Sequence, residues 1–150
     1  MKKKRTAVKR TSVALLKKEV WKAFSEYIRQ RDADWKGYVK CVTCQTYGPW
    51  QMFQSGHFIP GRRNSILFDE RHVYAQCVSC NVFKHGNLIA YYPFMLKKVG
   101  KKVIKELEDL NKIDKQFTVP ELEAKLMEIK KKTQDLHDSR TTQDIQPQIP

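Results

Sequence analysis

Two closely spaced cysteine pairs constrain the fold of this chain more than any other feature of its sequence. Cys41 and Cys44 form one C-x2-C motif, and Cys77 and Cys80 form a second. Two such motifs deliver four thiolates from two tight turns, which suits the tetrahedral coordination of a structural Zn²⁺. Because a four-thiolate site has no open coordination position, we expect this zinc to hold the fold and to take no part in chemistry.

Two other uses of the cysteines are less consistent with the sequence. A disulfide framework requires an oxidising compartment, and the basic start of the chain is not followed by the apolar segment of a secretory signal. A redox-active C-x-x-C would not explain why the motif occurs twice. The chain also has no apolar run of about 18 residues. We therefore expect a cytosolic protein with no membrane partner.

The charge of the chain points to nucleic acid. Lys and Arg outnumber Asp and Glu by 29 to 16, and the formal net charge is +13. Residues 1–40 alone hold 13 basic and 4 acidic side chains. Such a field attracts phosphate backbones through counterion release. The first few lysines can be solubilising residues of a tail, but an imbalance spread over this whole region favours DNA as the partner.

Helical patterns lie on both sides of a central segment that lacks them. Ser12 is a suitable N-cap for a basic, amphipathic helix that continues to about Gln30. After the last cysteine, Asn87 and Gly100 are suited to start and to stop a helix. The residues from Thr118 onward match a capping box that opens a further helix.

The central segment contains all four cysteines together with Gly, Pro and aromatic residues. Short strands are predicted at Tyr38–Val42, Trp50–Gln54 and His72–Gln76, and a short helix from about Asn81. The sequence thus predicts five parts. They are a disordered basic tail at 1–11, a basic helix at 12–35, a zinc-braced core at 36–100, C-terminal helices at 101–136 and a disordered tail at 137–150.

The order of motifs in the core resembles a known family. A C-x2-C pair, a strand that ends in Gly-His57-Phe, a loop, a second strand and a C-x2-C-N-x2-K motif ending at Lys84 follow one another. Over residues 38–87 this resembles the zinc-stapled branch of the HNH (ββα-metal) endonucleases. Over residues 30–112 it resembles, more narrowly, the lambdoid phage NinG/Rap recombination proteins. The resemblance implies an α+β fold with a ββα-metal core, braced by the four-cysteine zinc site and flanked by N- and C-terminal helices.

The resemblance also implies roles for particular residues. His57 would be the general base that activates water, for which a neutral imidazole with a pKa near 6.5 is suited. Asn81 would be the helix-borne ligand of a catalytic Mg²⁺ or Mn²⁺, and His85, four residues further, is a weaker candidate ligand. The candidate DNA-binding residues are Arg62, Arg63 and Lys84 near this site and Lys17, Lys18 and Lys22 on the first helix.

Each of these residues also has a structural interpretation. His57 can be an ordinary half-buried histidine, and Asn81 can cap the helix after the second cysteine pair. His72 is expected to be structural, and His85 can interact with a helix C-terminus. Many HNH enzymes have an Asp before the catalytic histidine as a second metal ligand, where this chain has Gly56. Asp69 or Glu70 is an alternative source of a carboxylate.

The sequence therefore supports two functions of different classes. The first is a metal-dependent DNA endonuclease, a phosphodiester hydrolase that the resemblance assigns to branched recombination intermediates such as Holliday junctions and D-loops. A phage-encoded enzyme of this kind would act in the cytoplasm of the host bacterium, and paired nicking would favour a homodimer. The alternative is a non-catalytic zinc-ribbon DNA-binding protein that assists recombination. A redox protein is a third and weaker hypothesis.

Overall fold

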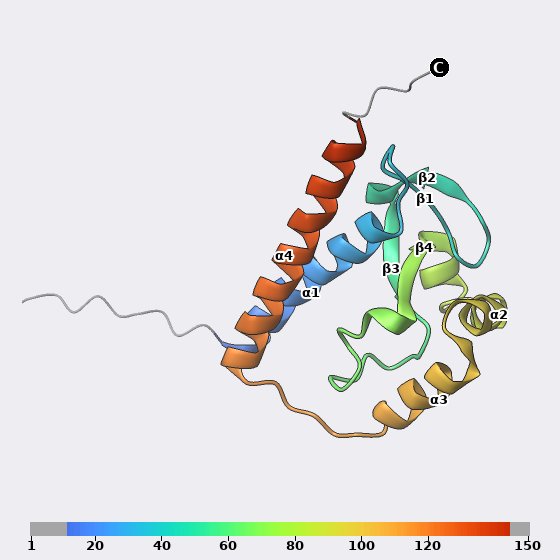
Figure 1. Ribbon diagram of the computed structural model, residues 1–150. Helices are drawn as coiled ribbons and strands as arrows, with labels where there is room; N and C mark the ends of the chain where they lie inside the picture. Colours follow the sequence, from blue (N-terminus) through green and yellow to red (C-terminus); the bar gives the residue numbers. More distant parts are fainter. Residues whose placement is uncertain (1–11, 145–150) are drawn as a thin grey trace, which may run out of the picture.

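The computed structural model describes residues 12–144 and shows a mixed α+β fold with two small antiparallel sheets (Figure 1). The predicted tail at 1–11, and residues 145–150 of the predicted tail at 137–150, lie outside the described residues. In chain order the helices are α1 (Val13–Arg31), α2 (Leu88–Lys98), α3 (Gly100–Leu110) and α4 (Val119–Asp144). The strands are β1 (Tyr38–Lys40), β2 (Tyr47–Pro49), β3 (Phe53–His57) and β4 (Val73–Cys77).

The first helix begins where the sequence predicts. Ser12 Oγ accepts a hydrogen bond from the backbone N–H of Leu15 at 3.2 Å, which satisfies a donor that the helix itself leaves free. An apolar stripe that includes Leu16, Val20 and Phe24 is buried against α4 and the sheet of β3 and β4. The predicted amphipathic helix is confirmed, and it forms one wall of the molecule.

The last helix is longer than predicted. The capping box at its start is confirmed, because Thr118 N–H donates to Glu121 Oε2 at 2.8 Å and Glu121 N–H donates to Thr118 Oγ1 at 3.4 Å. Residues 137–144, predicted to be part of a disordered tail, are helical. Tertiary contacts explain the difference: His137 Nε2 lies 2.6 Å from Gln30 Oε1, and Arg140 donates to the backbone carbonyl of Ala33 at 2.9 Å.

The strands form two hairpin-like pairs with different locations. β1 pairs with β2, and β3 pairs with β4 in a register that sets Phe53 opposite Cys77 and His57 opposite Val73. The predicted strand at Trp50–Gln54 is displaced, since Trp50–Met52 forms a 3-10 turn and the strand begins at Phe53. The short β2 strand was not predicted, because its Tyr-Gly-Pro sequence lacks the alternation of a strand.

Two apolar clusters cover the two faces of the β3–β4 pair, and Figure 1 shows α1 with α4 on one side and α2 with α3 on the other. Asn87 lies at the start of α2 as predicted, but its backbone is left-handed and its side chain makes no capping bond. Gly100, predicted to stop this helix, has a φ of +82° and is the first residue of α3. A left-handed residue at this junction lets the chain change direction between two consecutive helices.

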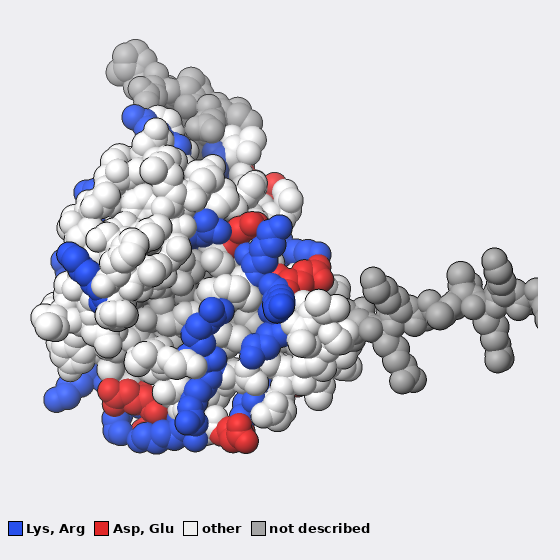
Figure 2. Space-filling view, turned by 180° about the vertical axis from the view of Figure 1, so that it is seen from behind, with Lys and Arg blue, Asp and Glu red and all other residues white. Residues whose placement is uncertain are grey.

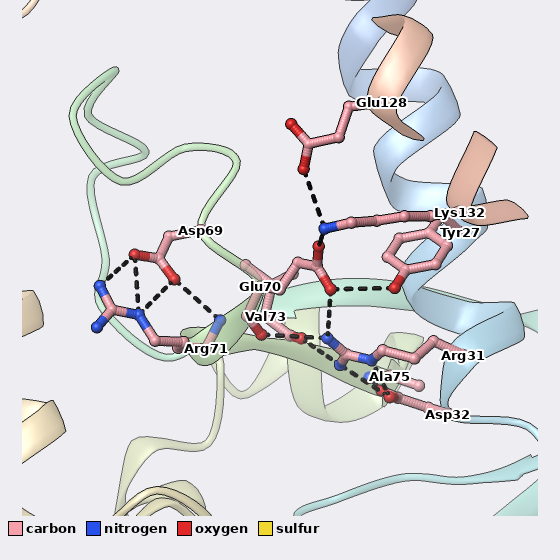
Figure 3. Close-up of polar contacts among 10 residues, drawn as sticks. All are labelled: Tyr27, Arg31, Asp32, Asp69, Glu70, Arg71, Val73, Ala75, Glu128 and Lys132. Atoms are coloured by element: carbon pink, nitrogen blue, oxygen red, sulfur yellow. Dashed lines mark hydrogen bonds and ion pairs between the residues drawn. The ribbon is translucent and has the colours of Figure 1, made fainter. Parts of the chain in front are cut away.

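A polar network fixes α1 and α4 to the start of β4 (Figure 3). Arg31 donates to the backbone carbonyls of Glu70 and Val73 at 3.1 and 2.9 Å. The carboxylate of Glu70 accepts a hydrogen bond from Tyr27 Oη at 3.1 Å and pairs with Lys132 of α4. These contacts hold the loop before β4 in place, and that loop forms part of the site described below. Among residues 12–144 there is no helix with the length and apolar character needed to cross a membrane.

Candidate functional site

The four cysteines form one cluster, although the two pairs are separated by more than thirty residues in the sequence. Cys41 directly follows β1, Cys77 ends β4, and Cys80 lies in a π-helical turn at Ser79–Phe83. All four Sγ atoms lie within 4.8 Å of one another, and those of Cys44 and Cys77 are 3.6 Å apart. A tetrahedral zinc with Zn–S bonds of about 2.3 Å has S···S distances of about 3.8 Å. The cluster therefore fits a structural metal such as zinc.

Polar groups contact the sulfur atoms of the cluster. They favour the thiolate of Cys44, whereas burial raises the pKa of the Cys77 thiol to about 12. The Thr46 hydroxyl lies 3.1 Å from Cys44 Sγ and lowers the pKa of that thiol to about 6. The backbone N–H of Cys80 donates to Cys77 Sγ at 3.4 Å, and Asn87 Nδ2 donates to Cys80 Sγ at 3.5 Å. Such second-shell donors orient the sulfur ligands of a metal. Asn87 thus supports the cysteine cluster in place of the helix-capping role predicted for it.

Beside the cysteine cluster lies a polar cleft of about 490 Å³. It brings together four residues that the sequence singled out, His57, Arg62, Asn81 and His85. The first helix contributes Trp21, Ser25 and Arg29, and the remaining wall is formed by Phe53, Gln54, Ser55 and Gly86. Among the described residues, no carboxylate lines this cleft.

His57 is held in a fixed orientation at the end of β3. Its ring stacks on Trp21, with centroids 5.0 Å apart and an interplanar angle of 20°. Its Nε2 lies 3.2 Å from the backbone carbonyl of Leu67. A carbonyl only accepts, so Nε2 carries the hydrogen and Nδ1 carries the lone pair.

The environment of His57 also keeps the imidazole neutral. Burial is the main cause that lowers its pKa to about 4, and the nearby His72 and Arg62 lower it further. The Leu67 carbonyl opposes this change only in part. The pKa is thus below the ordinary value near 6.5 that the sequence suggested, because the ring is packed into the cleft wall rather than standing in solvent.

His72 has the structural role predicted for it. Its side chain is fully buried, its Nε2 lies 2.8 Å from the carbonyl of Ile66, and its Nδ1 accepts from the backbone N–H of Ile59 at 3.5 Å. Its ring centroid is 5.2 Å from that of His57. His72 therefore fixes the loop at Ile66. The next residue of that loop, Leu67, orients His57.

Asn81 lies inside the π-helical turn and does not cap a helix. Its Nδ2 donates to Gln54 Oε1 at 2.7 Å. The capping interpretation is therefore wrong, and the short helix predicted from this residue is the turn at Ser79–Phe83. The bond to Gln54 leaves Asn81 Oδ1 directed toward Gly56, where a Cβ atom would lie 3.1 Å from it.

Two arginines from separate elements flank the cleft. The guanidinium of Arg62 lies over the Trp21 ring, 4.3 Å from its centroid. Arg29, which the sequence analysis did not single out, donates to the carbonyl of Phe53 at 3.1 Å and lies over Trp50. The i, i+4 spacing of Trp21, Ser25 and Arg29 is the signal that predicts one shared helix face.

The other predicted DNA-binding residues lie outside the cleft lining. Lys17 precedes Trp21 by one turn and donates to Asn64 Oδ1 at 2.6 Å. The side chains of Lys18, Lys22, Arg63 and Lys84 are exposed. Figure 2 shows Lys and Arg side chains in a band across one face of the molecule, with a few Asp and Glu side chains among them.

Neither acidic candidate from the loop before β4 reaches the cleft. Asp69 forms an ion pair with Arg71 at 2.7 Å, and Glu70 takes part in the network with Tyr27 and Lys132 (Figure 3). Both line a separate depression with Phe68 and Phe117. The expectation that one of them supplies a carboxylate to a metal beside His57 is therefore not met.

The chain is similar to phage proteins. The profile of the NinG family, described as "Bacteriophage Lambda NinG protein", matches residues 1–139. The proteins ninG of Salmonella phage P22, Escherichia phage 933W and Escherichia phage lambda are 33%, 32% and 31% identical to the chain over 125 residues. These matches cover 83% of the chain but only 58–59% of each relative, so the chain spans less than three fifths of their length. No solved structure matches the chain.

Proposed function

Because this chain belongs to the NinG family, we propose that it is a metal-dependent DNA endonuclease with His57 as its general base. Its substrates would be branched recombination intermediates, such as Holliday junctions and D-loops, in phage recombination. The observation that carries the proposal is the neutral, oriented imidazole of His57 in the wall of an arginine-flanked cleft. The order β3, β4 and a helical turn, braced by the cysteines, supports an HNH-like ββα-metal core.

The tautomer of His57 suits proton abstraction. With Nε2–H bound to the Leu67 carbonyl, Nδ1 accepts the proton of a water that attacks the phosphate. A pKa of about 4 keeps the ring unprotonated at neutral pH. A phosphodiester bound next to Arg62 raises this pKa toward the working pH, because a nearby anion favours the imidazolium and neutralises the arginine. The base therefore becomes stronger when substrate occupies the cleft.

In this proposal, Arg29 and Arg62 hold the scissile phosphate. Each guanidinium lies over a tryptophan ring, so it is oriented before DNA binds. A guanidinium donates two parallel hydrogen bonds to phosphate oxygens, which fixes the register of the backbone in the cleft. Lys17, Lys18 and Lys22 on α1, with Arg63 and Lys84, extend the basic surface and add affinity without sequence preference.

A divalent cation fits the cleft better than a second zinc. Asn81 offers an amide oxygen, a hard ligand that suits Mg²⁺ or Mn²⁺, while the soft cysteine thiolates suit zinc. When bound, such a cation would neutralise charge on the phosphate and on the leaving oxygen. His85 also lines the cleft and is the weaker candidate ligand.

The test is cleavage of labelled DNA by zinc-loaded protein. Four-way junction, flap and linear duplex are incubated with Mg²⁺ or Mn²⁺ and with wild type, His57→Ala or the matched control His137→Ala on α4. We expect wild type and His137→Ala to cut branched DNA and His57→Ala to lose about 10²–10⁴-fold in rate. Unchanged zinc content and junction binding in His57→Ala show that only chemistry is lost. Equal cutting by His57→Ala and wild type would refute the role of His57.

The accessory-protein alternative has one observation in its favour, the lack of a carboxylate in the described cleft lining. It predicts that wild type and His57→Ala bind junctions equally and that neither cuts them. Nicking of two symmetric strands would also favour a dimer on the junction, which sedimentation of the complex measures.

A further inference from the structure

A buried amide oxygen beside Gly56, the residue before His57, lacks a hydrogen-bond partner. Gln76 of β4 is completely buried, and its Nε2 donates to Thr43 Oγ1 at 3.2 Å and to the Gly86 carbonyl at 2.9 Å. Its Oε1 has no partner among the described residues. The Gly86 carbonyl fixes this orientation, because a carbonyl accepts from Nε2 but repels Oε1. A buried, unpaired carbonyl oxygen is unfavourable and calls for a donor or a cation.

A second amide oxygen converges on the same place. A Cβ atom built on Gly56 would stand 2.0 Å from Gln76 Oε1 and 3.1 Å from Asn81 Oδ1. Asn81 Oδ1 faces Gly56 because Asn81 Nδ2 donates to Gln54 Oε1. Two oxygens with partial negative charge thus both lie close to Gly56, the residue that precedes His57.

We propose that Gln76 Oε1 and Asn81 Oδ1 together bind the divalent cation of this site. The inference rests on the proposed endonuclease function, but the binding of the cation can be measured without DNA cleavage. Gly56 is required in this arrangement, because any side chain there would occupy the position of Gln76 Oε1. Gly56 thus leaves room for an amide oxygen from the neighbouring strand β4, at the position where many HNH enzymes have the carboxylate of an Asp.

The cysteine cluster positions both oxygens. Gln76 directly precedes Cys77, and Asn81 directly follows Cys80. A metal held by the four sulfurs therefore fixes the backbone next to both residues, and with it the positions of the two amide oxygens. Since both ligands are neutral, the free protein binds the cation weakly, and the phosphate of bound DNA supplies further oxygen ligands.

A rival arrangement needs no cation. If the amides of Asn81 and Gln54 are both turned over, Gln54 donates to Asn81 Oδ1, and Asn81 Nδ2 faces Gln76 Oε1. In that case Gln76 Oε1 is satisfied by protein alone, and the protein has no Gln76-dependent site for a metal ion.

The experiment is a titration of the zinc-loaded full chain with Mn²⁺, in which electron paramagnetic resonance measures the free ion. We expect Gln76→Met, which keeps the side-chain length and removes the oxygen, to weaken Mn²⁺ binding about tenfold or more. We expect Asn81→Asp, which adds a charge to the second ligand, to strengthen it about tenfold. The matched control Gln51→Met, at an exposed glutamine, should bind as wild type does.

A second measurement uses the unaltered protein, in case Gln76→Met does not fold. In a ¹⁵N spectrum, Mn²⁺ should broaden the side-chain NH₂ signals of Gln76 and Asn81 before those of the exposed Gln51. Unchanged Mn²⁺ affinity in folded Gln76→Met, or no selective broadening of the Gln76 signal, would overturn the assignment of the ligands.

The two proposals fail in different ways. If wild type cuts junctions while Gln76 has no effect on Mn²⁺ binding, the endonuclease stands and the ligand assignment is wrong. If Mn²⁺ binds in a Gln76-dependent way and no DNA is cut, the cation site stands and the endonuclease function is wrong.

Discussion

A methyl group at Gly56 tests the packing on which the cation site depends. It would lie 2.0 Å from Gln76 Oε1 and 2.8 Å from Gln76 Cδ, which is closer than non-bonded atoms approach. Gln76 cannot move aside without breaking its bonds to Thr43 and Gly86, each worth about 1 kcal/mol. Overpacking of a core adds about 1–3 kcal/mol. We therefore expect Gly56→Ala to lower the free energy of unfolding by about 3–5 kcal/mol.

The assay is urea denaturation of the zinc-saturated protein, with Gly48→Ala as a matched control. A Cβ at Gly48 would meet only the Phe53 side chain, at 3.3 Å, and neither glycine has a positive φ. In a Gln76→Ala background the same methyl at Gly56 should cost less than about 1 kcal/mol, because the obstructing amide is gone. If Gly56→Ala is as stable as wild type, or equally destabilising in both backgrounds, the described position of Gln76 is wrong.

Three further predictions address the histidine, the metal and the tail. The pKa of His57 is about 4 in the folded protein and near 6.5 in the unfolded chain, so the unfolded state binds more protons between these values; stability should fall as pH falls from about 6.5 to 4. His57→Gln should make the free energy of unfolding less dependent on pH. Unfolding of wild type and His57→Gln at pH 5 and 7.5 measures this, and an equal change with pH in both proteins would contradict the prediction. Chelation of zinc or Cys44→Ser should unfold the β1–β2 region and the turn at Ser79–Phe83, as circular dichroism and zinc content report, because metal-binding energy is folding energy here; a well-folded, zinc-free protein would count against it. Deletion of residues 1–10, which carry six Lys and Arg and lie outside the described residues, should weaken binding to all DNA shapes and reduce its salt dependence; an unchanged salt slope in fluorescence anisotropy would show that the tail is not involved.

Local signals in the sequence predicted the elements that depend on neighbouring residues. The N-cap at Ser12 and the capping box at Thr118 mark helix starts through bonds that span only three residues. The spacing of Cys41 and Cys44, repeated later in the chain, predicted a four-sulfur cluster because each pair presents its thiols from one turn. The motif that contains His57 likewise indicated a strand end, and β3 ends at this residue.

Features that depend on distant partners were decided by tertiary structure. Residues 137–144 are helical because His137 and Arg140 bond to the end of α1, more than a hundred residues away. Arg29 belongs to the cleft because α1 packs across β3, which no local pattern reveals. The pKa of His57 is low because Trp21 and the loop at Leu67 enclose its ring.

Gln76 shows the same division most clearly. In the sequence it is a polar residue in a short strand next to a cysteine, and nothing distinguishes it from a surface glutamine. Only the pairing of β3 with β4 and the fold of the turn after Cys80 bring its oxygen next to Gly56 and Asn81. The amino-acid order determined which groups are available, whereas the packing of separate segments determined which of them meet, because an amide oxygen acquires a role only from the atoms that surround it.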